Sequence, residues 1–280
     1  MPDEPEKSSK PIGVFDSGIG GLTVVRALRR QLPSEKIIYF GDTARVPYGT
    51  KSAETIRRYT REISSFLNNQ GIKLVVVACN SCSATALDCV EEEFGGPVIG
   101  VIEPGAQRAV GITRNGKIGV IGTKATIHSG AYEKALHELE ESVEVFSTAC
   151  PLFVPLAEEG METHPAAQLI AREYLEPLME QSVDTLILGC THYPLLKRTI
   201  EEVVGEGVAV VDSAESTAEA ALEVLTARGE MNSNPNSETT LIRTYVSDDP
   251  MGVEKFCGTL MPSEKIWVGT AQPAVAFSNK

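Results

Sequence analysis

Short apolar runs alternate with longer amphipathic stretches along the first part of the chain. The runs occupy residues 12–15, 36–40, 74–78 and 97–102. The stretches after the first three runs have helical spacing and cover residues 22–32, 52–70 and 84–94. The run at 74–78 is apolar throughout, as expected of a strand in a parallel sheet that helices cover on both faces. This alternation predicts an α/β fold.

The same pattern restarts in the second half of the chain. Its apolar runs occupy residues 117–121, 143–146, 184–188 and 208–211. Gly13 lies 66 residues before Cys79, and Gly119 lies 71 residues before Cys190. The run at 143–146 leads into a predicted loop that ends at residues 154–155. We interpret the matching order and spacing as an internal duplication with a period of about 106 to 111 residues.

The C-terminal segment has no counterpart between the repeats. Its predicted helix, polar linker, strand, helix and short strand lie at residues 214–227, 229–237, 241–246, 251–260 and 266–268. We expect it to cross back to the first half, because it would then close an interface between two similar halves. The predicted fold is two pseudo-symmetric α/β domains, each a mostly parallel sheet flanked by helices. Their predicted bounds are 1–103 plus 213–280 and 104–212, and the polar residues 1–10 are expected to form a disordered tail.

Composition and charge are those of an ordinary globular protein. The chain has 280 residues, of which 42% are hydrophobic and 22% charged, and this length favours two domains. The net charge of −13 argues against nucleic acid or an anionic membrane as the main partner. No apolar run is long enough to span a bilayer, and the polar N-terminus lacks the apolar core of a secretion signal. We therefore expect a cytoplasmic protein with reduced thiols.

Two of the six cysteines end matching apolar runs. Cys79 follows the third run of the first half, and Cys190 follows the third run of the second half. Ligands bind at the carboxyl ends of strands in open parallel sheets, where the N-terminus of the next helix also favours a thiolate. Small polar residues follow both cysteines, namely Asn80, Ser81, Ser83, Thr191 and His192. If the two halves face each other, both thiols can contact one ligand from opposite sides. The cysteines without such neighbours are expected to pack in the core, and they are Cys89, Cys150 and Cys257.

Cys79 and Cys82 also have the spacing of a C-x-x-C pair, which leaves a second interpretation open. The pair could form a redox dithiol, or it could bind zinc together with Cys190 and His192. However, the sequence has no second C-x-x-C, and only one of its four histidines follows a predicted strand. No other feature of a thioredoxin-like fold is visible. A ligand site without a metal is therefore the favoured interpretation.

Further segments could supply polar groups to the same site. Asp16 and the glycines after it follow the first run, and their backbone N–H groups could bind a carboxylate, although the signatures of a nucleotide-binding loop are missing. Asp16 could instead be a helix N-cap. Residues 45–49 offer the Tyr48 hydroxyl and a glycine N–H. His192 could form a hydrogen bond with the thiol of Cys190 or transfer a proton. An acidic residue such as Glu158 is usually solvated.

These segments resemble those of the glutamate racemases, a family within the aspartate/glutamate racemase superfamily. The matching segments are Gly13-Val-Phe-Asp-Ser-Gly-Ile-Gly-Gly-Leu22, Tyr39-Phe-Gly-Asp-Thr-Ala-Arg-Val-Pro-Tyr-Gly49, Ala78-Cys-Asn-Ser81, Gly122-Thr123, Leu188-Gly-Cys-Thr-His-Tyr-Pro-Leu195 and Asp212-Ser213. The resemblance extends over nearly the whole chain, from residue 11 to residue 267. The two cysteine segments together indicate this family, whereas either one alone would indicate only the superfamily.

The resemblance implies cofactor-independent interconversion of L- and D-glutamate for peptidoglycan, in a cleft between the two domains. It implies that Cys79 removes the α-proton of D-glutamate and that Cys190 removes the α-proton of L-glutamate. It also implies that Asp16, Glu158 and His192 assist the thiols. The residues that match the family's substrate-binding positions are Asp16, Ser17, Tyr48, Gly49, Asn80, Ser81, Thr123, Thr191 and His192.

The chemistry of the residues agrees with this resemblance. Racemisation needs a base on one face of Cα and an acid on the other, and two thiols on related halves supply both. No lysine lies in these strand-end clusters, which argues against a Schiff base with pyridoxal phosphate. Ser81 stands where the family commonly has threonine, and Cys82 stands where a small residue is usual. The resemblance further implies a homodimer. It leaves open activation by a cell-wall precursor and a preference for aspartate or another acidic amino acid.

Overall fold

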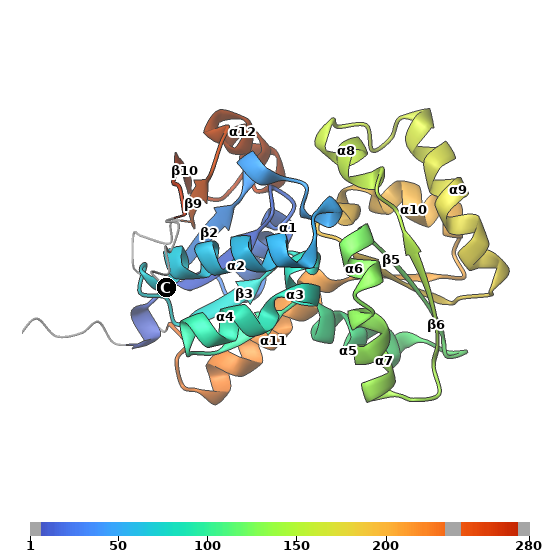
Figure 1. Ribbon diagram of the computed structural model, residues 1–280, viewed down its shortest axis with the longest axis horizontal. Coiled ribbons are helices and arrows are strands. Elements are labelled where there is room, and N and C mark those ends of the chain that lie inside the picture. The colour runs from blue at the N-terminus through green and yellow to red at the C-terminus, as the bar shows by residue number, and fades with distance from the viewer. Residues whose placement is uncertain (1–6, 233–241, 274–280) are drawn as a thin grey trace, which may run out of the picture.

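The computed structural model describes residues 7–232 and 242–273 of the chain. Within these ranges two β-sheets lie side by side, and every pair of neighbouring strands is parallel (Figure 1). The first sheet contains, in spatial order, β10 (Ile266–Thr270), β9 (Ile242–Val246), β2 (Ile37–Gly41), β1 (Ile12–Asp16), β3 (Leu74–Val77) and β4 (Val98–Gly100). The second contains β6 (Glu144–Ala149), β5 (Lys117–Gly122), β7 (Thr185–Gly189) and β8 (Ala209–Asp212). The predicted α/β fold with two parallel sheets is confirmed.

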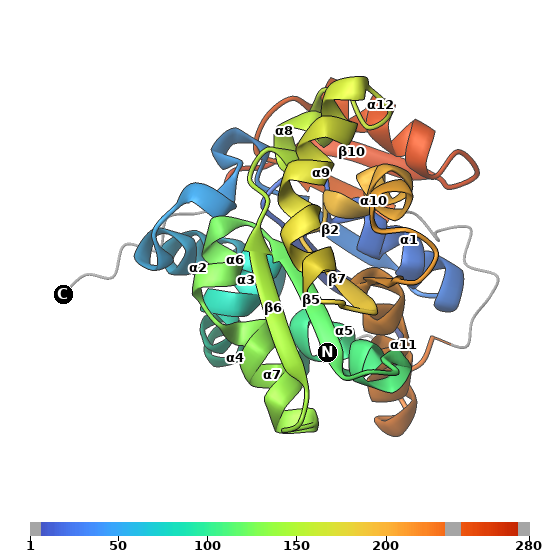
Figure 2. The same ribbon diagram turned by 90° about the vertical axis from the view of Figure 1, so that its right-hand side faces the viewer.

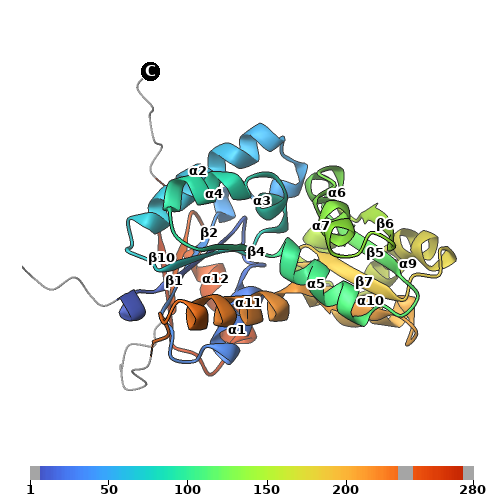
Figure 3. The ribbon, with the colours of Figure 1, turned by 90° about the horizontal axis from the view of Figure 1, so that it is seen from below.

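Helices cover both faces of the first sheet (Figure 3). One face carries α2 (Ala53–Asn68), α3 (Asn80–Thr85) and α4 (Leu87–Phe94). The opposite face carries α1 (Leu22–Gln31), α11 (Ser213–Ala227) and α12 (Pro250–Leu260). Phe15 and Val77 pack on the first of these faces, whereas their neighbours Val14 and Val76 pack on the other. Strand β3 is apolar throughout because both of its faces are buried.

The second sheet is covered in the same way. Figure 2 looks onto this half, where β6, β5 and β7 run side by side. One face carries α8 (Phe153–Glu158), α9 (Pro165–Glu180) and α10 (Lys197–Val204). The other face carries α5 (Ile102–Ile112) and α7 (Ala131–Leu139), and the short α6 (Lys124–His128) precedes α7. The first half of the molecule is the first sheet with its helices, and the second half is the second sheet with its helices. Helix α11 of the first half packs against α5 of the second, so the two halves also contact each other through helices.

The two sheets repeat one topology. The order β2-β1-β3-β4 of the first sheet corresponds to the order β6-β5-β7-β8 of the second. Cys79 follows β3, and Cys190 follows β7 at the corresponding place. This agreement supports the predicted duplication. The C-terminal strands β9 and β10 extend the first sheet beyond β2 and have no equivalent in the second sheet.

Three local predictions are corrected by the structure. The predicted helix at 84–94 is two helices that meet at Ala86, whose extended φ of −148° breaks the helical path. Ile102, predicted to end a strand, begins helix α5 instead. The end of the predicted loop, at residues 154–155, lies in helix α8. Pro155 is the third residue of this helix, where a backbone N–H would have no helical partner, so proline costs little there.

The described part of the predicted N-terminal tail packs against the first half. Residues Lys7–Ser9 form a 3₁₀ helix, and the Ser8 carbonyl accepts a hydrogen bond from Lys73 Nζ at 2.8 Å. Residues 1–6 of that tail, residues 233–237 of the predicted linker and residue 241 lie outside the described residues. Other 3₁₀ helices occur at Thr43–Arg45, Tyr48–Thr50 and Tyr193–Leu196. Across residues 7–232 and 242–273, none of the helices combines the length and apolar character needed to cross a membrane.

A buried ion pair lies at the start of β3. Lys73 Nζ lies 2.6 Å from Glu35 Oε2, and each side chain is only 1% exposed. Lys73 also donates to the carbonyl of Glu230 at 2.7 Å. Burial lowers the pKa of Lys73, while the contact with Glu35 opposes this shift. The ammonium group thus links the turn before β2, the start of β3 and the end of α11.

Candidate active site

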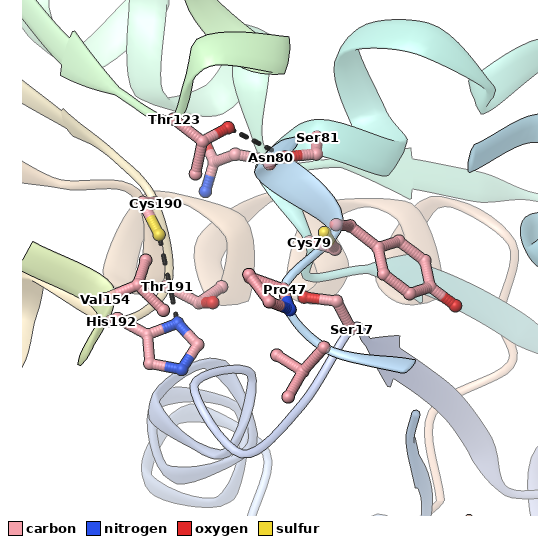
Figure 4. Close-up of a pocket in the computed structure, with 13 residues that line it drawn as sticks. Ser17, Pro47, Cys79, Asn80, Ser81, Thr123, Val154, Cys190, Thr191 and His192 are labelled. Atoms are coloured by element: carbon pink, nitrogen blue, oxygen red, sulfur yellow. Dashed lines mark hydrogen bonds between the residues drawn. The ribbon is translucent and has the colours of Figure 1, made fainter. Parts of the chain in front are cut away.

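A small cavity lies between the two halves of the molecule. Its walls come largely from residues that directly follow strands β1, β3, β5 and β7, and from the loop after β2. The lining residues are Ser17, Val46, Pro47, Tyr48, Gly49, Cys79, Asn80, Ser81, Thr123, Val154, Cys190, Thr191 and His192. Figure 4 shows the sulfur atoms of Cys79 and Cys190 directed toward the same space from opposite sides. This arrangement is the one expected when the carboxyl ends of two parallel sheets face each other.

Cys79 is held between a buried strand and a helix. It is the N-cap residue of α3 and is 4% exposed. Hydrogen bonding from the Cys82 side chain lowers the pKa of the Cys79 thiol below its ordinary value, although burial opposes this. A hydrogen bond from the Ser17 side chain acts in the same direction. The surroundings therefore favour the thiolate, which is the form that can accept a proton.

Cys190 belongs to a chain of polar contacts in the second half. Its Sγ atom lies 3.9 Å from Nδ1 of His192 (Figure 4). The other ring nitrogen, Nε2, donates to Oε1 of Glu158 at 3.1 Å, and Glu158 is the last residue of α8. Burial lowers the pKa of His192, but the hydrogen bonds with Cys190 and Glu158 more than offset this and leave it well above the ordinary value. The imidazole can therefore carry a proton beside the thiol.

Asp16 lies behind the cavity wall. It is fully buried at the end of β1, and its Oδ2 atom accepts from the backbone N–H groups of Gly18 and Gly21 at 3.1 and 3.0 Å. Its Oδ1 atom accepts from Thr191 Oγ1 at 3.2 Å. Thr191 lines the cavity, and Asp16 is absent from the lining residues. The carboxylate thus holds the turn after β1 and a hydroxyl group from the opposite half.

The wall beside Cys79 has one polar atom that lacks a partner. Oδ1 of Asn80 accepts from the Tyr132 hydroxyl at 2.7 Å. Nδ2 of Asn80 is buried and has no hydrogen-bond partner among the described residues. The hydroxyl groups of Ser81 and Thr123 are hydrogen-bonded to each other at 3.0 Å across the two halves. Burying an amide N–H group without a hydrogen-bond acceptor costs free energy. This group is therefore suited to donate a hydrogen bond to an oxygen of a ligand.

The loop after β2 is held by a carboxylate that the sequence reasoning missed. Asp42 is fully buried, and its Oδ2 atom accepts from the Tyr48 hydroxyl and from Arg45 Nε. Its Oδ1 atom accepts from Ser247 Oγ at 2.8 Å. Burial raises the pKa of Tyr48, and its hydroxyl is already used by Asp42. Asp42 could have been found in the sequence, because only Gly41 separates it from a predicted strand.

Gly49 packs against Thr123 of the second half. A Cβ atom on this residue would lie 2.3 Å from Cβ of Thr123. No side chain fits at that distance, so glycine allows the loop after β2 to approach the second half. Val46, Pro47 and Val154 also line the cavity and were not singled out from the sequence, since apolar residues in loops carry no distinctive signal.

The other cysteines differ from Cys79 and Cys190. All six cysteines are free thiols in the structure. Cys82 is buried next to Cys79, and burial raises its pKa well above the ordinary value. The three cysteines predicted to pack in the core do so, with pKa values raised by burial: Cys89, Cys150 and Cys257. Within the described ranges, no group of three or more His, Cys, Asp or Glu side chains is arranged to hold a metal ion.

The predicted site residues therefore fall into two groups. Most of them line the cavity: Ser17, Tyr48, Gly49, Cys79, Asn80, Ser81, Thr123, Cys190, Thr191 and His192. Asp16 and Glu158 contact lining residues from behind, through Thr191 and His192 respectively. Both halves contribute a thiol and hydrogen-bonding groups to one small space. Such a site can hold a polar ligand between two acid/base groups.

Comparison with known proteins places this site in a family. The model of the Asp/Glu/Hydantoin racemase family matches residues 12–221. A glutamate racemase of Chlorobaculum tepidum is 54% identical over 271 residues, which are 95% of this chain and 99% of that protein. The crystal structure of glutamate racemase isoform RacE1 from Bacillus anthracis superposes with a TM-score of 0.90 at 41% identity, covering 95% of this chain and 98% of that one. Glutamate racemase from Francisella tularensis in complex with D-glutamate gives 0.87 at 38% identity and the same coverage.

The family match covers the two cysteine segments and every residue that lines the cavity. The similarity extends over nearly the full length of each protein compared, and it includes the arrangement of both sheets. The chain belongs to the Asp/Glu/hydantoin racemase family.

Proposed function

We propose that this chain interconverts L- and D-glutamate without a cofactor, by proton transfer at Cα between Cys79 and Cys190. The observation that carries the proposal is the placement of two buried thiols on opposite sides of one cavity, each at the end of an equivalent strand. A base on one face of Cα and an acid on the other is the minimum that racemisation requires. The similar proteins support glutamate as the substrate, because they are glutamate racemases of the same length and fold.

In the proposed reaction, each thiol acts once as a base and once as an acid. With L-glutamate, the Cys190 thiolate removes the α-proton, and the thiol of Cys79 delivers its proton to the opposite face of Cα. With D-glutamate the two roles are exchanged. The electron pair left at Cα is stabilised by delocalisation into the α-carboxylate, and a donor such as Asn80 Nδ2 stabilises the negative charge that develops there. Burial of the site strengthens these contacts because water is excluded.

Three polar groups are proposed to support the thiols. His192 can donate a hydrogen bond to Cys190, and Glu158 favours the protonated form of this histidine. Asp16 fixes the hydroxyl of Thr191 and the glycine-rich turn after β1. The remaining residues that we assign to substrate binding are Ser17, Tyr48, Gly49, Asn80, Ser81 and Thr123.

The proposal also covers the setting of the enzyme. We assign residues 1–103 plus 213–280 to one domain and residues 104–212 to the other, supported by the place of β9 and β10 in the first sheet. The resemblance to the family favours a cytoplasmic homodimer that supplies D-glutamate for peptidoglycan. We expect activity without a cell-wall precursor as activator. Light scattering on the purified protein tests the dimer.

The test is incubation of the purified, reduced protein with L-glutamate in D₂O without added cofactor. Loss of the α-proton signal by NMR together with loss of circular dichroism is the expected result. No exchange and no racemisation with a folded protein would refute the proposal. Racemisation of aspartate in place of glutamate would refute the substrate assignment alone.

Serine variants test the role of each thiol. Cys79→Ser and Cys190→Ser should each lower kcat/KM for racemisation by about 10²–10⁴-fold, because a serine hydroxyl holds its proton far more tightly than a thiol. Exchange into D₂O should become one-sided: Cys79→Ser should still exchange the α-proton of L-glutamate faster than that of D-glutamate, and Cys190→Ser should do the reverse. Cys257→Ser, on the buried face of α12, is the control. Near-normal racemisation by either active-site variant would contradict the two-thiol scheme.

A further inference from the structure

One side chain of the second half contacts the segments that carry both thiols. Tyr132 lies on α7, and its hydroxyl donates to Oδ1 of Asn80, the residue after Cys79, at 2.7 Å. Tyr132 and Asn80 are each 3% exposed. The hydrogen bond therefore crosses between the halves in a place that water does not reach.

The ring of Tyr132 packs against the strand that leads to the other thiol. A Cβ atom on Gly189, the last residue of β7, would lie 3.1 Å from Cε2 of this ring. Gly189 directly precedes Cys190. A Cβ atom on Gly105 in α5 would lie 3.6 Å from the opposite edge of the ring, at Cε1. The ring is thus fixed between β7 and α5, while its hydroxyl reaches the first half.

This contact determines which way the Asn80 amide faces. Burial raises the pKa of Tyr132, and hydrogen bonding with the Ser213 side chain does not reverse the shift. The hydroxyl therefore keeps its proton and acts as a donor to Asn80. Because this proton is donated to Oδ1 of Asn80, the NH₂ end of the amide is turned away from Tyr132 and Nδ2 is left for the cavity. Nδ2 is the buried atom without a partner among the described residues.

We propose that Tyr132 is a positioning residue, which fixes the Asn80 amide so that its N–H group faces a carboxylate of the substrate. The inference rests on the proposed racemisation of glutamate. Without the Tyr132 hydroxyl, the Asn80 amide can rotate and turn its oxygen toward the substrate carboxylate. The two oxygens then repel each other. The effect should then appear in substrate binding and turnover and depend on Asn80.

The test is a double-mutant cycle with Tyr132→Phe and Asn80→Ala. Tyr132→Phe should lower kcat/KM about tenfold, the loss expected when a charged acceptor loses one oriented donor. L- and D-glutamate have the same free energy, so the equilibrium constant between them is 1 and kcat/KM is equal in the two directions. The variant must therefore lower kcat/KM by the same factor for both enantiomers, and this equality checks the measurement. In the Asn80→Ala background, Tyr132→Phe should have no further effect on kcat/KM. The matched control is Tyr193→Phe, which removes another buried hydroxyl of the second half, one that donates to the Cys150 carbonyl at 2.8 Å.

The outcomes separate the explanations. A value of kcat/KM within twofold of the unchanged protein would overturn the inference, and so would an equal loss with and without Asn80. A lack of racemisation in the unchanged chain would instead overturn the proposed function. If Tyr132→Phe does not fold, the side-chain amide signal of Asn80 in the unchanged protein decides the matter by NMR. This signal should shift when D-glutamate is added, and an unmoved signal in glutamate-saturated protein would overturn the inference.

Discussion

The contact between His192 and Glu158 predicts a specific change in the pH dependence of the enzyme. His192 is buried beside Cys190, and Nε2 lies 3.1 Å from Oε1 of Glu158. Glu158→Gln keeps the shape and an oxygen that can accept this hydrogen bond, but it removes the negative charge. The carboxylate is one of the groups that raise the pKa of His192. We therefore expect the pKa of His192 to fall in the variant.

The geometry sets the size of the effect. Two opposite charges 3.1 Å apart attract by about 5 kcal/mol at an effective dielectric constant of about 20, and this is an upper bound. The Glu158 side chain is 32% exposed, which screens the charge, and glutamine retains the hydrogen bond. About 2 kcal/mol remains, in the range of hydrogen bonds to charged groups, and it corresponds to a factor of about 30 in the protonation equilibrium.

The assay is an NMR titration of the histidine ring protons, with the His192 signal identified by its absence in His192→Asn. In the unchanged protein the imidazolium persists to higher pH, so in Glu158→Gln the basic limb of kcat/KM should move to lower pH. Glu159→Gln is the control, because it removes an equal charge one residue along the chain. If His192 titrates at the same pH with and without the Glu158 charge, the electrostatic reasoning is wrong. If its titration moves but the basic limb does not, protonation of His192 is not needed for turnover.

Two further changes test features outside the acid/base groups. Lys73→Met should lower the free energy of unfolding by about 3–5 kcal/mol, because it leaves the charge of Glu35 buried without an opposite charge beside it. Lys134→Met removes an exposed ion pair and should lower the free energy of unfolding by less than about 1 kcal/mol. Chemical denaturation measures both variants, and equal losses for Lys73→Met and Lys134→Met would contradict the importance of the buried pair. Gly49→Ala should lower kcat/KM about 100-fold with little loss of thermal stability, because the added Cβ displaces Thr123 and opens the cavity. Near-normal kcat/KM of Gly49→Ala would show that close contact between Gly49 and Thr123 is not needed for activity.

The sequence predicted the parts of the site that follow strands. Cys79 and Cys190 were found because each ends an apolar run, and the carboxyl ends of parallel strands meet at one edge of a sheet. The same logic applied to Asp42, which was passed over although it follows β2 directly. The location of the cavity between two related halves followed from the resemblance to a family. It could not be derived from the apolar pattern, which does not say how two sheets face each other.

Contacts that depend on distant segments were out of reach. Glu158 reaches His192 because α8 ends beside the strand end of β7, and nothing in an acidic pair of residues indicates this. The bond between Tyr132 and Asn80 joins residues 52 positions apart and in different halves. The helices of the second half were expected from the fold class but were not located along the sequence. The buried side of α9 includes Ala167 and Ala171, whose small side chains make the helical spacing inconspicuous.

The place of β9 next to β2 has a consequence for synthesis of the chain on the ribosome. About 200 residues separate the end of β2 from the start of β9, which is roughly 10 to 40 s of elongation at ordinary rates of translation. Throughout this interval the outer edge of β2 has unpaired backbone groups, and such an edge is prone to pair with another chain. The second sheet is complete in sequence by residue 212 and is free to form first. The edge of the nascent first sheet therefore stays open until β9 emerges, which leaves it exposed to pairing with another chain for longer than the edges of the second sheet.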